Sequence, residues 1–162
     1  MQNARRLLIA LSAAAFLSAC ATSAPAPVSV ADTIARDANL STLNGLVQKA
    51  GLTDSLKAAG PMTVFAPTNE AFKAVPAKTM TELAADPARL KAVLGYHVLP
   101  VRVLAAEVKP GNAKTVQGAN VALAKAGTFV TVEEAMVQDA DILATNGVVH
   151  TVDRVLLPPA SR

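Results

Sequence analysis

The most informative part of the chain is Thr63-Val64-Phe65-Ala66-Pro67-Thr68-Asn69-Glu70-Ala71-Phe72. Its first half is rich in β-branched and aromatic residues, which predicts a buried strand that Pro67 stops. Thr68 can then cap a short helix, from which Phe72 packs back onto the strand. We interpret this strand-to-helix unit as a folding element. A recognition site built from the same residues is the alternative.

Helix signals lie on both sides of this unit. Before it, Leu40, Leu43, Leu46, Val47 and Ala50 repeat at the spacing of one helix face, and Gly51 is placed to end that helix. After it, Asp86-Pro87 provides a capping side chain followed by proline at the first helical position. We expect the helix that begins there to end at Gly95.

The C-terminal half has the character of strands. We expect a short strand over residues 96–99 and the longest strand over residues 136–144. Asn146-Gly147 separates the latter from residues 148–156, which are also β-rich. An Asn-Gly pair between two such runs predicts a hairpin, because both residues tolerate a positive φ.

The order of these elements predicts the fold class. Helices come first and strands later, without a regular alternation of strand and helix, which indicates an α+β fold with a mainly antiparallel sheet. We expect one domain over residues 28–159, followed by a short tail at 160–162.

The N-terminus has the features of an export signal. Arg5 and Arg6 precede a short apolar run at residues 7–17, and the run ends in Leu17-Ser18-Ala19-Cys20. This tetrad resembles the lipobox of bacterial lipoproteins. The resemblance implies a signal peptide at 1–19, lipidation of Cys20, and an Ala/Pro-rich tether at 20–27. We therefore expect an exported protein with a lipid anchor in the cell envelope. Residue 21 is Ala rather than Asp, which resembles the pattern of lipoproteins sent to the outer membrane, facing either the periplasm or the surface.

Charge and composition argue against nucleic-acid binding. The formal net charge is +3, of which Arg5 and Arg6 supply two charges that leave with the signal. The remaining chain has no cluster of Lys and Arg, no Trp and one Tyr, so it lacks a basic stripe with stacking side chains.

Three stretches, in order, resemble the fasciclin domain. They are residues 63–72, Tyr96-His97, and Asn146-Gly147-Val148-Val149-His150-Thr151-Val152-Asp153-Arg154-Val155-Leu156. The resemblance implies a wedge of two β-sheets flanked by short helices. It also implies a role in adhesion and extracellular interaction, without a cofactor or catalytic activity.

Tyr96 and His97 are the candidate interaction residues. Neighbours on a strand point to opposite faces, so one side chain could be buried while the other is presented to a partner. The resemblance implies a contact role for this pair, and packing inside the fold is the alternative. We expect His150 to be buried with a hydrogen bond. Asp153 is expected to accept hydrogen bonds from backbone amides.

No enzyme motif stands out. His97 and His150 are the only histidines, and the carboxylates lack metal-ligand spacing, so we expect neither a metal nor a cofactor. The expected function is an envelope-anchored adhesion or protein-interaction module, acting as a monomer on a protein or surface polymer. The alternative is a periplasm-facing lipoprotein that binds a small ligand, in an apolar cavity, or supports envelope integrity.

Overall fold

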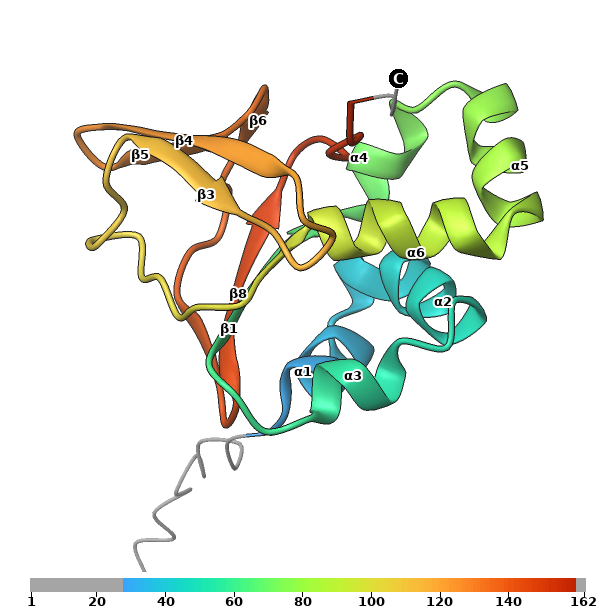
Figure 1. Ribbon diagram of the computed structural model, residues 1–162, viewed down its shortest axis with the longest axis horizontal. Helices are drawn as coiled ribbons and strands as arrows, with labels where there is room; N and C mark the ends of the chain where they lie inside the picture. Colours follow the sequence, from blue (N-terminus) through green and yellow to red (C-terminus); the bar gives the residue numbers. More distant parts are fainter. Residues whose placement is uncertain (1–27, 160–162) are drawn as a thin grey trace, which may run out of the picture.

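The computed structural model describes residues 28–159, which form two β-sheets and a group of helices (Figure 1). The helices are α1 Val30–Arg36, the 3-10 helix η1 Ala38–Leu40, α2 Ser41–Lys49, α3 Thr53–Lys57, α4 Asn69–Lys73, α5 Ala77–Ala85 and α6 Pro87–Tyr96. The strands are β1 Met62–Pro67, β2 Val98–Leu99, β3 Gly111–Lys114, β4 Asn120–Ala126, β5 Phe129–Val132, β6 Ala135–Met136, β7 Ile142–Ala144 and β8 Gly147–Val152.

Each sheet has four strands. The first has the order β2-β1-β8-β7, and its central pair, β1 and β8, is parallel with Phe65 opposite His150. Its outer pairs are antiparallel, as are all pairs of the second sheet, β3-β4-β5-β6. The predicted α+β class, with two mainly antiparallel sheets and flanking helices, is confirmed.

The central strands of the first sheet, β1 and β8, are buried on both faces. Val64 and Ala66 of β1 belong to the apolar cluster under the helices, whereas Phe65 belongs to the cluster between the two sheets. This division follows from the strand geometry, because successive side chains point to opposite faces. A sheet covered on both sides explains why β1 and β8 are apolar almost throughout, rather than alternating with polar residues.

The local helix signals are confirmed. The Thr68 hydroxyl accepts a hydrogen bond from Ala71 N, and Asp86 accepts from the backbone amides of Ala88 and Arg89. Gly51 follows α2 with a φ of 67°, the left-handed conformation that favours glycine after a helix. These contacts span three residues or fewer, so the sequence around each helix end is sufficient to specify them.

Two predicted boundaries are wrong. Helix α6 continues through Gly95 to Tyr96, and the strand after it contains only Val98 and Leu99. Gly95 serves a close approach instead: a Cβ there would lie 3.3 Å from Gln117 Cβ, and Gln117 N donates to the Gly95 carbonyl. Likewise, residues 136–144 form no single strand. They contain the last residue of β6 and the whole of β7, and between these strands Asp141 has a φ of 60°.

The Asn146-Gly147 hairpin is confirmed, but its turn differs from the prediction. Strands β7 and β8 pair with Ala144 opposite Gly147, and neither Asn146 nor Gly147 has a positive φ. Gly147 is the first residue of β8 and lies against β1. A Cβ at this position would clash with the Met62 carbonyl oxygen and lie 2.8 Å from Met62 Cγ. Glycine is required here by space rather than by backbone conformation.

Candidate functional site

Tyr96 is buried at the C-terminal end of α6. Its hydroxyl lies 3.0 Å from the Asn120 carbonyl oxygen and 3.2 Å from Glu133 Oε1, and both of these atoms can only accept. Burial, followed by the charge of Glu133 and its hydrogen bond, raises the pKa of Tyr96 to about 12. The phenol is therefore protonated at neutral pH and ties α6 to the second sheet.

His97 is also buried, with an exposed fraction of 2%. Its Nε2 accepts a hydrogen bond from Leu156 N at 2.9 Å, so the proton must sit on Nδ1, which donates to the Val93 carbonyl at 2.7 Å. Burial lowers the pKa of His97 to about 4, against a smaller opposing effect of the Val93 carbonyl. The imidazole is neutral at physiological pH and joins α6 to the C-terminal segment.

Neither Tyr96 nor His97 is presented at the surface, which agrees with the alternative in which both side chains pack inside the fold. The two residues lie at the end of a helix rather than on a strand, and both side chains are buried. The strand expected from residue 96 begins only at Val98, because the helix continues past Gly95. The contact role of the pair stays a prediction, and the buried rings themselves offer no surface to a partner.

The residues of the first motif contact the protein itself. The Thr63 hydroxyl donates to the Val101 carbonyl at 2.7 Å and accepts from Val103 N at 2.8 Å, which fixes the segment after β2. Asn69 accepts from Thr42 N and donates to the Ala38 carbonyl, which joins α4 to the start of α2. Val64, Phe65, Ala66, Pro67 and Phe72 are buried.

Asn146 makes the most extensive connections of the second motif. Its Oδ1 accepts from Val30 N at 2.9 Å, and its Nδ2 donates to the carbonyls of Leu56 and Ala58, each at 2.9 Å. One side chain thus holds the start of α1 and the end of α3 against the β7–β8 hairpin. These contacts reach well beyond the hairpin turn that the Asn146-Gly147 pair predicts.

His150 and Asp153 fix the neighbouring segments. The His150 ring stacks on Phe65 with a centroid separation of 5.6 Å, accepts from Asp141 N through Nδ1, and donates from Nε2 to the Val103 carbonyl. Asp153 accepts from Met136 N at 2.7 Å, which places β6 beside the end of β8. Both side chains make the kind of contact that was expected of them.

Ionisable side chains form no metal site in the part of the chain that the structure describes. No group of three or more His, Cys, Asp or Glu residues is close enough together within residues 28–159 to hold a metal ion. In that same range, no helix is both long enough and apolar enough to cross a bilayer. Cys20 and the tether lie outside the described residues.

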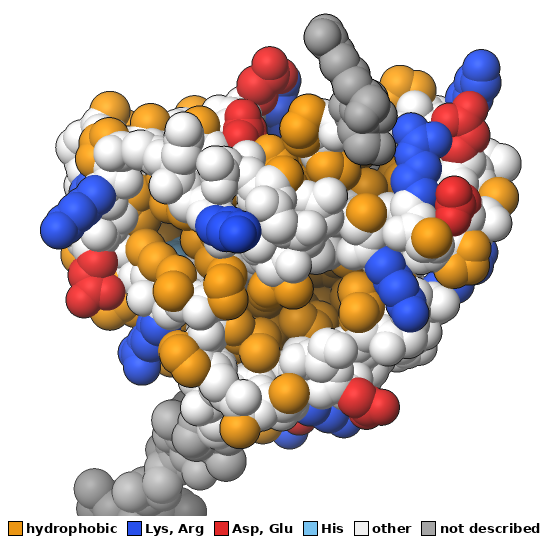
Figure 2. Space-filling model, viewed as in Figure 1, with side chains coloured by type: hydrophobic (Ala, Val, Ile, Leu, Met, Phe, Trp, Pro, Cys, Tyr) orange, Lys and Arg blue, Asp and Glu red, His pale blue; other side chains and the backbone are white. Residues whose placement is uncertain are grey.

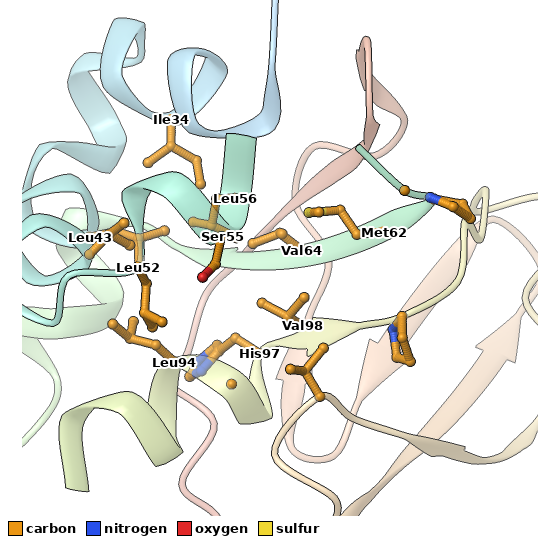
Figure 3. Close-up of a pocket in the computed structure, with 16 residues that line it drawn as sticks. Ile34, Leu43, Leu52, Ser55, Leu56, Met62, Val64, Leu94, His97 and Val98 are labelled. Carbon is orange, nitrogen blue, oxygen red and sulfur yellow. The ribbon is translucent and has the colours of Figure 1, made fainter. Parts of the chain in front are cut away.

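The candidate site is an apolar cavity of about 350 Å³ between the helices and the first sheet. Figure 2 shows it as a hollow with hydrophobic walls near the centre of one face. In Figure 3, side chains from α1, α2, α3 and α6 converge on the same space as those from β1 and β2. The inner wall consists of residues that are buried in the helix-side cluster: Ile34, Leu43, Val47, Leu56, Val64 and Leu94.

The rim of the cavity is exposed. It includes Ser55, Gly60, Pro61, Pro100 and Val116, and the Val116 side chain has an exposed fraction of 59%. The only polar side chains in the lining are those of Ser55 and His97, and both nitrogens of His97 are already hydrogen-bonded. The site can therefore exclude water and hold hydrocarbon.

Comparison with known proteins identifies the family. The model of the fasciclin domain matches residues 38–158. Protein sll1483 of Synechocystis is 39% identical over 134 residues, which cover 82% of this chain and 74% of that protein. The pig transforming growth factor-beta-induced protein ig-h3 is 40% identical over 134 residues, which cover 82% of this chain but 20% of that longer protein.

The fold has a solved counterpart. A domain pair from the insect cell adhesion molecule Fasciclin I matches with a TM-score of 0.61 at 22% identity, covering 76% of this chain and 46% of that chain. At this identity the likeness concerns the fold. The chain is thus comparable to one unit of proteins that contain further sequence.

Proposed function

The chain belongs to the fasciclin domain family, and from that membership we propose that it is an envelope-anchored interaction module. The family is an adhesion-type extracellular module, and exposed apolar patches mark sites of protein interaction. The observation that carries the proposal is the apolar rim of the cavity, where Pro61, Pro100 and Val116 are exposed around a hollow (Figure 2). The partner is a protein or a surface polymer.

The anchor is the second part of this proposal. Cys20 carries the lipid, residues 21–27 give the domain reach, and export places the domain outside the cytoplasm. The Leu17-Ser18-Ala19-Cys20 motif supports it. With Cys20→Ser, fractionation should find the protein released from the membrane or left unprocessed, because several acyl chains are needed for stable anchoring. Retention in the membrane at the normal mature mass would contradict the lipid anchor.

Binding to candidate partners tests the interaction role. The panel consists of matrix proteins, the bacterium's own surface polysaccharides and its envelope proteins. The probe is the soluble chain, defined as residues 20–162 with Cys20→Ser. Val116→Glu at the cavity rim should abolish saturable binding. Leu143→Glu on β7 is the matched control, because Leu143 has the same exposed fraction of 59% and does not line the cavity. An equal loss of binding in both variants, or unchanged binding in both, would contradict a contact at the rim.

A second function is favoured by the depth of the cavity. Its inner wall reaches Val64 and Leu94 in the buried cluster, whereas a protein-docking surface can be flat. A concave apolar site with few polar groups is typical of small-molecule binding. We therefore also propose that the domain binds a small apolar ligand. Chemical-shift perturbation of the methyl groups that line the cavity would test this role without knowledge of any protein partner.

A further inference from the structure

The chemistry of the cavity wall restricts what can bind inside. No charged side chain lines it, and the hydroxyl of Ser55 lies at the exposed rim. A water molecule needs two to four polar partners to be held in a cavity, and the inner wall, made of Ile34, Leu43 and Leu94 among others, offers none. Hydrocarbon is the occupant that suits this wall.

The size restricts the occupant further. A volume of about 350 Å³ is near the lower end for ligand sites. At about 30 Å³ for each small group, it accepts roughly a dozen non-hydrogen atoms. That is enough for one aliphatic chain of medium length. It is too little for the paired chains of a diacyl lipid.

A cationic depression lies directly beside the rim. Gly60 and Pro61 line both the cavity and a second, more open depression that also contains Lys57 and Arg102. No acidic side chain lines this depression. Lys57 is paired with Asp32 at 3.5 Å, with both side chains about half exposed, and Arg102 has no ion-pair partner among residues 28–159. Arg102 is exposed and available to an anion.

From this arrangement we propose that the domain binds a single-chain fatty carboxylate, with its aliphatic chain in the cavity and its carboxylate on the Lys57 and Arg102 side of the Gly60-Pro61 lip. The charge complementarity comes from the depression, and the apolar selectivity comes from the wall. This inference deepens the second function proposed above. It does not depend on the adhesive role or on the anchor.

The test compares decanoate, below its critical micelle concentration, with the neutral decanol, below its solubility limit in water, on the soluble chain at neutral pH. Titration calorimetry should show saturable binding of decanoate and weaker binding of decanol. Methyl shifts of Val64 and Leu94 should move along with the calorimetric isotherm, because both residues line the cavity. Absence of saturable decanoate binding, or shifts confined to residues away from the cavity, would overturn the proposal.

Variants separate the two halves of the site. Ser55→Trp places an indole at the rim from an exposed helix position and should remove binding of both probes, with circular dichroism confirming the fold. Arg102→Gln should weaken the affinity for decanoate by about two- to fivefold, which is the contribution of an exposed ion pair, and leave the affinity for decanol unchanged. Lys114→Gln, on β3 and outside both hollows, should change neither.

The outcomes distinguish this proposal from the broader one. If decanoate and decanol bind equally and Arg102→Gln changes neither, the carboxylate proposal is overturned while the domain still binds apolar ligands. If neither probe binds, both the fatty carboxylate and the small-ligand function are wrong, and the adhesive function remains to be judged by its own assay.

Discussion

Alanine at two glycine positions should change stability in opposite directions. Gly147 lies at the start of β8, where a Cβ would clash with the Met62 carbonyl oxygen. Gly45 lies inside α2, is exposed, and a Cβ there would meet no atom within 4 Å. The same added methyl group therefore meets backbone at one site and open space at the other.

The magnitudes follow from these surroundings. Overpacking of a tight site costs about 1–3 kcal/mol, and the hydrogen bond from Met62 N to the Asn146 carbonyl, at 3.3 Å, should be lost as well. We expect Gly147→Ala to lower the free energy of unfolding by about 3 kcal/mol. Gly45→Ala should raise it by about 0.5–1 kcal/mol, because alanine loses less conformational entropy than glycine in a helix.

Urea unfolding of the soluble chain, followed by circular dichroism, measures both effects. Met62→Ala in the Gly147→Ala background adds a sharper test, because it removes the side-chain contact at 2.8 Å but leaves the carbonyl oxygen in place. The double variant should show no recovery. Full recovery would show that the side chain rather than the backbone excludes a Cβ. A neutral Gly147→Ala would refute the steric reasoning altogether.

Two further predictions concern buried polar groups. Asn146→Ala should lower the free energy of unfolding, measured with urea, by about 3 kcal/mol, because three backbone groups lose their hydrogen-bond partner. Asn146→Asp should lower it by at least as much, because a carboxylate would face two carbonyl oxygens. As a control, Asn112→Ala at an exposed position should change the free energy of unfolding by no more than about 0.5 kcal/mol. An equal loss of stability in both alanine variants would contradict this account. The second prediction concerns pH. Burial lowers the pKa of His97 from 6.5 to about 4, so between these two pH values the unfolded chain binds a proton at His97 and the folded chain does not. Lowering the pH through this window should therefore reduce stability by up to about 3 kcal/mol. His97→Gln should flatten that part of the pH profile, and an unchanged profile would show that His97 does not cause it.

The sequence by itself determined the features that rest on neighbouring residues. The strand at Met62–Pro67, the Thr68 and Asp86 caps and the β7–β8 hairpin each follow from a few adjacent side chains. Their physical causes are local, since a cap acts within one turn and a hairpin brings neighbouring runs together. The α+β class follows as well, because it depends only on the order of helices and strands.

Tertiary structure decided what distant segments do to one another. Asn146 contacts Val30, which is 116 residues away in the chain, and Gly147 is selected by the close approach of β1, so neither role is visible in the turn sequence. Tyr96 and His97 are buried because α6 continues past Gly95, where Gln117 packs.

The cavity is the clearest case of this kind. The sequence contains its aliphatic residues at helical spacing, but such residues serve equally well to fill a core or to surround an empty space. Only the relative positions of the elements that line it, namely α1, α2, α3, α6, β1 and β2, leave the hollow open. Packing geometry, rather than composition, therefore gives this domain its candidate binding site.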